Sequence, residues 1–194
     1  MRYQVGIIGS GNWGSTVSKI IGENVANLSD YEPKVLMWVY EELFEEAKLS
    51  HIINQKHENP KYLPGIKLPT NVVAVTDMLE VVSASTHLVF VLPHQFLNST
   101  CDKILAAIRK DAIGISLTKG LIEHQTELIL PSSVLRTKLG IHVSVLSGAN
   151  IASEIAAEIF STSTIGCDNT IYADQWKSLF SRSYFKIESI LFTE

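Results

Sequence analysis

The chain has 194 residues, of which 46% are hydrophobic and 19% are charged, a composition typical of one soluble globular domain with a substantial apolar core. The formal net charge is -4 and no run of lysine or arginine stands out, which argues against nucleic acid or an anionic membrane as a partner. No apolar run approaches the roughly 20 residues that span a bilayer.

Short apolar runs alternate with longer amphipathic stretches along the chain. The runs predict strands at 3–9, 34–40, 72–75, 88–92, 113–117 and 143–146, and the stretches predict helices at 13–26, 43–53, 95–109 and 151–158. Because the strand runs are almost continuously apolar, we expect a mostly parallel sheet that is buried on both faces. The alternation predicts a doubly wound α/β fold of the Rossmann type, with helices on both faces of the sheet.

Two further segments complete the predicted organisation. Residues 59–70 contain three of the six prolines and are expected to form an ordered but irregular loop. Near the end of the chain, 163–167 and 184–192 predict strands that flank a helix at 169–181. We therefore expect a core at about residues 1–150 and an αβ extension at 151–194. Since no helix follows to cover the last strand, we also expect that a following domain is absent from this chain.

A glycine-rich motif lies between the first predicted strand and helix, with the sequence Gly9-Ser10-Gly11-Asn12-Trp13-Gly14. It matches the dinucleotide-binding pattern G-x-G-x-x-G in the structural context that this pattern requires. Gly9 would allow the tight turn, Gly11 would let a pyrophosphate approach the backbone, and Gly14 would let the helix pack closely on the strand. The alternative is a plain glycine turn. A Walker A loop is excluded, because Ser15 stands where its lysine should be.

The segment after the second predicted strand, VYEELFEE at 39–46, bears on coenzyme choice. It has four carboxylates and no arginine or lysine, so it would repel the 2′-phosphate of NADP and favours NAD. Tyr40 can lie against the adenine and Glu41 can face the ribose, but the sequence leaves open which of them occupies the ribose site. The glutamates can also simply begin a helix, where acidic residues are favoured.

Polar and aromatic residues follow three later strands, at the sheet edge where ligands of open α/β sheets bind. Phe96 can form a wall of the nicotinamide pocket. Lys119 can polarise a carbonyl group and deliver a proton, or it can be a solvated loop lysine. Asn150 can orient a substrate hydroxyl, or it can cap the helix that follows.

The six histidines and the two cysteines, Cys101 and Cys167, show no metal-ligand spacing, so no metal site is predicted. Two cysteines are also too few for a disulfide framework. We therefore expect reduced thiols in a cytoplasmic protein.

Several segments together resemble the NAD-dependent glycerol-3-phosphate dehydrogenases of the eukaryotic cytosolic type. They are GSGNWGS at 9–15, VYEEL at 39–43, HENPKYLPGIKLPTNVVAV at 57–75, FVLPHQF at 90–96, ISLTKG at 115–120, GANIASEIA at 148–156 and STIGC at 163–167. The resemblance implies reversible hydride transfer between NADH and dihydroxyacetone phosphate, which gives sn-glycerol 3-phosphate. Thr118 and Ser147 depart from residues that are frequent in the family.

The resemblance also implies residue roles. The turn from Gly9 to Gly14 would bind the pyrophosphate, Tyr40 and Phe96 would border the dinucleotide, and Lys119 and Ala152 would line the cofactor and substrate region. Lys119 would contact the substrate and help to polarise its ketone, with Asn150 nearby.

In this family a helical domain follows the part that resembles this chain. It supplies a second lysine, an arginine that clamps the substrate phosphate, and much of the interface of a homodimer. A catalytically silent NAD-binding module, acting as a sensor or as an interaction partner, is therefore the alternative function.

Overall fold

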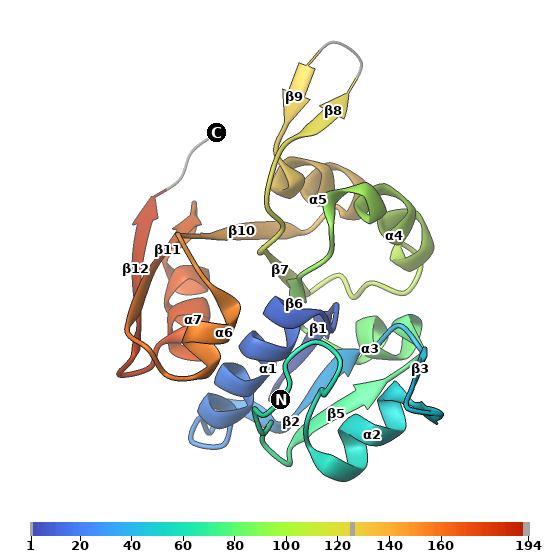
Figure 1. Ribbon diagram of the computed structural model, residues 1–194. Helices are drawn as coiled ribbons and strands as arrows, with labels where there is room; N and C mark the ends of the chain where they lie inside the picture. Colours follow the sequence, from blue (N-terminus) through green and yellow to red (C-terminus); the bar gives the residue numbers. More distant parts are fainter. Residues whose placement is uncertain (1, 125–126, 192–194) are drawn as a thin grey trace.

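The structure is a computed structural model and describes residues 2–124 and 127–191. Eight strands form one sheet in the order β12-β11-β10-β7-β6-β1-β2-β5 (Figure 1). The strands are β1 (Tyr3–Ile8), β2 (Tyr31–Trp38), β5 (Val72–Val75), β6 (His87–Phe90), β7 (Ile113–Ser116), β10 (His142–Ser147), β11 (Ser161–Cys167) and β12 (Phe185–Leu191). All neighbouring strands pair in parallel except β10 and β11, which are antiparallel. The predicted mostly parallel sheet is confirmed.

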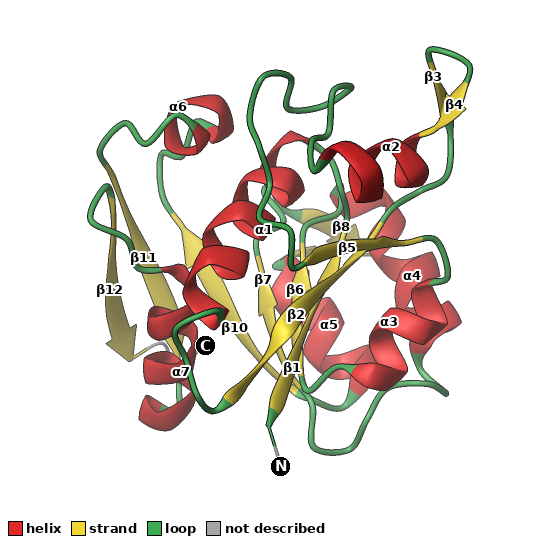
Figure 2. Cartoon of the chain, turned by 90° about the horizontal axis from the view of Figure 1, so that it is seen from below, coloured by secondary structure: helices red, strands yellow, loops and turns green. Residues whose placement is uncertain are grey.

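Helices cover both faces of this sheet, and each face has its own apolar core. One core joins the strands to α1 (Asn12–Val25), α2 (Leu49–Lys56), α6 (Ala152–Ala156) and α7 (Thr170–Phe180). The other core joins them to α3 (Met78–Ala84), α4 (Leu97–Ile104) and α5 (Pro131–Leu139). Figure 2 shows α3, α4 and α5 together on one side of the sheet. Burial on both faces explains why the strand sequences are almost continuously apolar.

The predicted helix at 43–53 is wrong over its first six residues. They form a hairpin of β3 (Leu43–Phe44) and β4 (Ala47–Lys48), and α2 begins only at Leu49. Glu45 and Glu46, at the tip, have left-handed backbone angles, with φ of 48° and 65°. The apolar pattern was misleading because Leu43 is 71% exposed, so this leucine contributes no core-facing position to a helix.

The sequence analysis also misplaced or missed other elements. The predicted helix at 95–109 is a short 3-10 turn, η1 (His94–Phe96), followed by α4. Helices α3 and α5 and the small hairpin of β8 (Ile122–His124) and β9 (Glu127–Ile129) were not predicted. Signals for both helices were present, because Asp77 caps α3 by accepting from the amide of Leu79, and α5 begins with Pro131.

The C-terminal part of the chain continues the same sheet. The predicted strands and helix are present as β11, α7 and β12, while residue 192 of the last predicted strand lies outside the described residues. Helix α6 and the segment that follows it are each bound to α1 by a polar contact. The Thr16 hydroxyl donates to the carbonyl of Ala152 at 3.1 Å, and the Lys19 ammonium pairs with Glu158 at 2.8 Å. None of the helices in the described part of the chain has the length and apolar character needed to cross a membrane.

Candidate functional site

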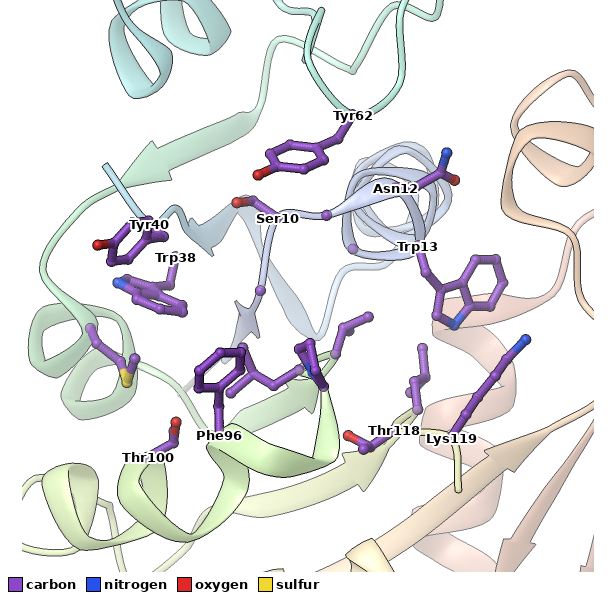
Figure 3. Close-up of a pocket in the computed structure, with 18 of the residues that line it drawn as sticks. Ser10, Asn12, Trp13, Trp38, Tyr40, Tyr62, Phe96, Thr100, Thr118 and Lys119 are labelled. Atoms are coloured by element: carbon purple, nitrogen blue, oxygen red, sulfur yellow. The ribbon is translucent and has the colours of Figure 1, made fainter. Parts of the chain in front are cut away.

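A cavity of about 1120 Å³ lies at the carboxyl ends of β1, β2, β6, β7 and β10. This is the position where ligands bind in open α/β sheets. Figure 3 shows Trp38 and Tyr40 at one end of the cavity and Trp13 and Lys119 at the other. The predicted site residues that line it are Gly9, Ser10, Gly11, Asn12, Trp13, Gly14, Tyr40, Phe96, Lys119, Asn150 and Ala152. The fold therefore brings together all of these residues, which are spread over more than 140 positions of the sequence.

The glycine turn has almost no space for side chains at two of its three glycines. Gly9 has a φ of 124°, and a Cβ on it would lie 2.4 Å from the carbonyl oxygen of Val91. A Cβ on Gly14 would lie 2.2 Å from the carbonyl oxygen of Gly9. A Cβ on Gly11, in contrast, would meet no atom within 4 Å. Packing therefore requires Gly9 and Gly14, whereas Gly11 leaves open space where the turn faces the cavity.

The N-terminus of α1 faces this open space. No described side chain caps the helix, and its first turn contains no acidic residue. The first amide groups of a helix have no partner within the helix, and the helix dipole adds partial positive charge there. This arrangement can accept a pyrophosphate, so the described residues fit a dinucleotide.

Asn59 supports the turn from behind and was not identified from the sequence. Its side chain is fully buried and donates to the carbonyl of Ser10 and to the hydroxyl of Ser15, both at 2.8 Å. The Ser15 hydroxyl in turn donates to the same Ser10 carbonyl at 3.1 Å. The only sequence signal was that Asn59 begins the loop predicted to be ordered.

Aromatic side chains form the end of the cavity next to β2. Tyr40 is 70% exposed and Phe96 is 53% exposed, although both line the cavity. Trp38, also in the lining, was not singled out from the sequence; its indole nitrogen donates to the carbonyl of Thr76 at 3.1 Å. Such exposed, flat apolar surface around a cavity suits an aromatic ring system.

The two glutamates after β2 have different environments. The carboxylate of Glu41 accepts from the hydroxyl of Ser50 at 2.6 Å and from its amide at 3.3 Å, so it caps the start of α2. Glu42 lines the cavity instead. The possibility that Glu41 faces the ribose is therefore not supported by the geometry. The alternative that the glutamates begin a helix is wrong, because α2 begins at Leu49 and Glu41 reaches its start only through the side chain. Tyr40 remains at the cavity.

The carboxylate of Glu42 is bound by two neighbouring side chains. Its carboxylate pairs with the Lys61 ammonium and accepts from the Tyr62 hydroxyl at 2.8 Å. The hydrogen bond from Lys61, followed in strength by that from Tyr62, lowers the pKa of Glu42. A carboxylate with such partners is ionised at neutral pH.

At the opposite end of the cavity, Lys119 is exposed, and its ammonium lies 3.4 Å from the backbone carbonyl oxygen of Asn150. The side chain of Asn150 exchanges hydrogen bonds of 2.6 and 2.8 Å with the hydroxyl of Ser163, which is buried. Ile151, not Asn150, is the cap residue of α6, so the capping alternative for Asn150 is wrong. The roles predicted for Lys119 and Asn150 in the reaction stay predictions.

Three potential metal ligands meet away from the cavity, which sequence spacing did not show. Ligand atoms of His142, Cys167 and Asp168 lie within 4.8 Å of one another. Each has a protein partner, because His142 pairs with Asp168, and the Cys167 sulfur accepts from the Ser144 hydroxyl and donates to the carbonyl of Asn169. These contacts satisfy the group without an ion, and the prediction that no metal is bound stays a prediction.

Comparison with known proteins places this chain in one family. The family described as NAD-dependent glycerol-3-phosphate dehydrogenase N-terminus matches residues 4–173. The chain is 48% identical over 184 residues to the cytoplasmic NAD(+) glycerol-3-phosphate dehydrogenase of Rattus norvegicus, which covers 95% of this chain and 53% of that protein. It is 54% identical over 163 residues to the glycerol-3-phosphate dehydrogenase 1-like protein of Mus musculus, over 84% of this chain and 46% of that protein.

Solved structures agree. The glycerol-3-phosphate dehydrogenase of Plasmodium falciparum superposes with a TM-score of 0.93 at 41% identity, over 97% of this chain and 52% of that one. The enzyme of Saccharomyces cerevisiae gives a TM-score of 0.93 at 38% identity, over 98% and 57%. The chain thus spans about half the length of the curated relatives it matches. It belongs to the NAD-dependent glycerol-3-phosphate dehydrogenase family and corresponds to the N-terminal domain of that family.

Proposed function

We propose that this chain binds NAD(H) in the cavity at the carboxyl ends of the strands, as the coenzyme-binding part of a glycerol-3-phosphate dehydrogenase. One observation carries the proposal: the uncapped N-terminus of α1 opens behind a turn in which Gly11 leaves free space. The pyrophosphate would accept hydrogen bonds from backbone amides between Gly9 and Gly14. Tyr40 and Phe96 would border the ring systems of the dinucleotide, and Ala152 would close the cavity from α6.

The proposed reaction is the reversible reduction of dihydroxyacetone phosphate to sn-glycerol 3-phosphate. NADH, when bound, supplies a hydride to the carbonyl carbon of such a substrate. The Lys119 ammonium, at the exposed end of the cavity, would donate a hydrogen bond to the ketone oxygen and stabilise the negative charge that develops there. Asn150, held by the Ser163 hydroxyl, would border the substrate next to this ammonium.

A second candidate is a coenzyme-binding module with little or no turnover. What favours it is that Lys119 stands in an exposed position and that the chain spans about half the length of its relatives. General acid–base catalysis alone typically contributes roughly 10²–10⁴-fold to a rate, so groups outside this chain can decide whether it turns over. Both candidates share the coenzyme site and differ in the reaction.

Coenzyme binding is tested by titrating the chain with NADH in a calorimeter, and by repeating the titration with Gly11→Val. Residue 11 is the cap residue of α1, with an extended backbone at φ of -65° and ψ of -170°, so valine fits the backbone and its side chain enters the open space. We expect the variant to fold, as shown by an unchanged circular dichroism spectrum, and to lose NADH binding. An absence of heat with the wild-type chain, or full binding by the variant, would refute the proposal.

Turnover separates the two candidates. NADH oxidation is followed in the presence of dihydroxyacetone phosphate, with the wild-type chain and with Lys119→Met. We expect weak NADH binding and little or no oxidation by the wild-type chain, which would favour the module. Oxidation at the rate of a complete dehydrogenase, lost in the variant, would establish the enzyme instead.

We also infer a cytoplasmic location and, for a protein that carries the family's second domain, a homodimer. The location follows from relatives that are named cytoplasmic enzymes. The dimer follows from the family resemblance, and sedimentation analysis of this chain and of a full-length relative would test it.

A further inference from the structure

The loop that precedes β5 joins two parts of the cavity wall. Asn59, at its start, is bound to the carbonyl of Ser10 in the glycine turn. The Asn59 side-chain oxygen also accepts from the amide of Tyr62 at 3.3 Å, and its backbone carbonyl accepts from the amide of Leu63 at 2.8 Å. The loop thereby holds Tyr62 at a set position relative to the pyrophosphate turn. Figure 3 shows the Tyr62 ring next to Ser10, on the side of the cavity where Tyr40 lies.

From this position, the loop holds the carboxylate of Glu42 with two groups. The Tyr62 hydroxyl donates to one carboxylate oxygen at 2.8 Å, and the Lys61 ammonium pairs with the other. The Lys61 ammonium also lies 5.2 Å from the centre of the Tyr62 ring. The side chain of Glu42 keeps 22% of its surface exposed and that of Lys61 keeps 33%. An ordered carboxylate in the cavity wall thus has an ammonium directly bound to it.

This placement has opposite consequences for the two nicotinamide coenzymes. A carboxylate can accept hydrogen bonds from the hydroxyls of an adenosine ribose, and it repels a phosphate on the 2′ position. An ammonium attracts the same phosphate. Because Lys61 is paired with Glu42, the carboxylate neutralises the positive charge of the ammonium. The cavity wall therefore contains a group that would reject a 2′-phosphate, and the ammonium bound to that group would attract one.

We propose that Glu42, held by Lys61 and Tyr62, is the residue that selects NAD(H) over NADP(H), and that Lys61 is a latent 2′-phosphate ligand which Glu42 keeps occupied. The proposal rests on the coenzyme function proposed above. It assigns the discrimination to Glu42 and not to its neighbour Glu41, whose carboxylate is bound to Ser50 at the start of α2. It also gives the loop at 59–70 a function in coenzyme choice through Asn59, which fixes Tyr62.

The test compares the affinities of NADH and NADPH, measured by coenzyme fluorescence, in Glu42→Gln and Glu41→Gln. Both changes remove one carboxylate charge at adjacent positions, and glutamine keeps the size of the side chain. We expect Glu42→Gln to strengthen NADPH binding on the order of tenfold while NADH binding weakens only slightly. Glu41→Gln, the matched control, should leave the ratio of the two affinities unchanged.

Two Lys61 variants test the second half of the proposal. In the double variant Glu42→Gln with Lys61→Met, the gain in NADPH affinity should largely disappear, because the released ammonium causes most of it. In Lys61→Met alone, Glu42 loses its neutralising partner, so discrimination against NADPH should become stronger. This single variant changes a partly exposed side chain and gives an answer even if Glu42→Gln fails to fold. All the affinity changes should shrink as salt is raised, since the interactions are between charges.

The outcomes distinguish a failure of the proposed coenzyme function from a failure of the roles proposed for Glu42 and Lys61. A wild-type chain that binds neither coenzyme would refute the proposed function itself. A wild-type chain that binds NADH, together with a folded Glu42→Gln variant of unchanged NADPH affinity, would overturn the role of Glu42. Equal changes in the Glu41 and Glu42 variants would show a general charge effect and would also overturn it. A gain that persists in the double variant would overturn the role of Lys61.

Discussion

Two regions of the cavity wall, the glycine turn and the surroundings of Lys119, are built in different ways. At the glycine turn, Gly14 packs against the carbonyl of Gly9 without room for a Cβ, and the buried Asn59 holds the carbonyl of Ser10. Lys119, in contrast, is exposed, and its ammonium lies 3.4 Å from the carbonyl oxygen of Asn150. A change at Gly14 or Asn59 should therefore damage folding and coenzyme binding together, whereas a change at Lys119 should affect the chemistry alone.

The largest effect should come from Gly14→Ala. The added methyl group would lie 2.2 Å from the backbone oxygen of Gly9, so either α1 or the turn must move. We expect a loss of about 3 kcal/mol in the free energy of unfolding, measured with urea, together with loss of NADH binding. Gly11→Ala is the control, since its methyl group meets no atom within 4 Å, and it should cost no more than about 1 kcal/mol, the difference between glycine and alanine at a helix cap. Equal urea midpoints for the two variants would contradict the packing argument.

A somewhat smaller effect is expected for Asn59→Ala. The change removes three hydrogen bonds of a fully buried side chain. It leaves the carbonyl of Ser10 and the hydroxyl of Ser15 with fewer donors and the amide of Tyr62 without this acceptor. We expect a loss of about 2 kcal/mol in unfolding free energy and weaker NADH binding. Asn98→Ala, at an exposed position of α4, serves as the matched control. If both alanine variants were equally stable, Asn59 would not support the turn.

A pH titration tests a buried group that contributes to the fold and lies away from the cavity. His87 is buried at the start of β6, so it lies at the amino ends of the strands, opposite the cavity. Burial lowers its pKa to about 4 from an ordinary 6.5. Between pH 6.5 and 4, His87 is therefore protonated in the unfolded chain but neutral in the folded chain. The free energy of unfolding should decrease as the pH is lowered through this range and level off below about pH 4. We expect a loss of roughly 2 kcal/mol by pH 5 from this residue.

The control for this titration is His87→Gln. It should unfold with a smaller dependence on pH between 4 and 6.5 than the wild-type chain, whatever its stability at neutral pH. The same slope in both proteins would show that His87 is not the titrating group. NADH binding, measured at pH 7, should be the same in both, because the cavity lies at the other edge of the sheet.

The smallest effect on stability should come from Lys119→Met. An exposed side chain that touches one carbonyl oxygen contributes little to folding, so we expect a change within about 0.5 kcal/mol and an NADH affinity close to that of the wild-type chain. Any reduction of dihydroxyacetone phosphate should be lost. A large drop in thermal stability would show that the glycine turn and the surroundings of Lys119 do not differ as the contacts indicate.

Local sequence patterns were sufficient for much of the fold. The alternation of apolar strands and amphipathic helices predicted the mostly parallel sheet, because burial on both faces leaves a continuous apolar run in each strand. The same patterns failed at 43–48, where Leu43 is apolar but exposed and where two glutamates adopt left-handed backbone angles. Helix α3 was missed although Asp77 marks its start, since its seven residues are too few for a clear period.

The candidate site likewise contains residues that the sequence identified and residues that it did not. The glycine motif is contiguous, so its turn and helix could be predicted from the sequence. Asn59 and Glu42 could not be identified, because their partners lie 44 to 49 and 19 to 20 residues away along the chain. Nor could sequence distinguish Glu41 from Glu42, which have the same side chain at adjacent positions.

The sequence by itself determined that this chain forms a dinucleotide-type α/β sheet with a glycine turn before its first helix, because those features depend on residues that are neighbours in the chain. Only the tertiary structure decided which carboxylate enters the cavity, what supports the turn, and where Lys119 and Asn150 meet. Those outcomes depend on contacts between distant segments, and such contacts exist only once the sheet has brought its strand ends together.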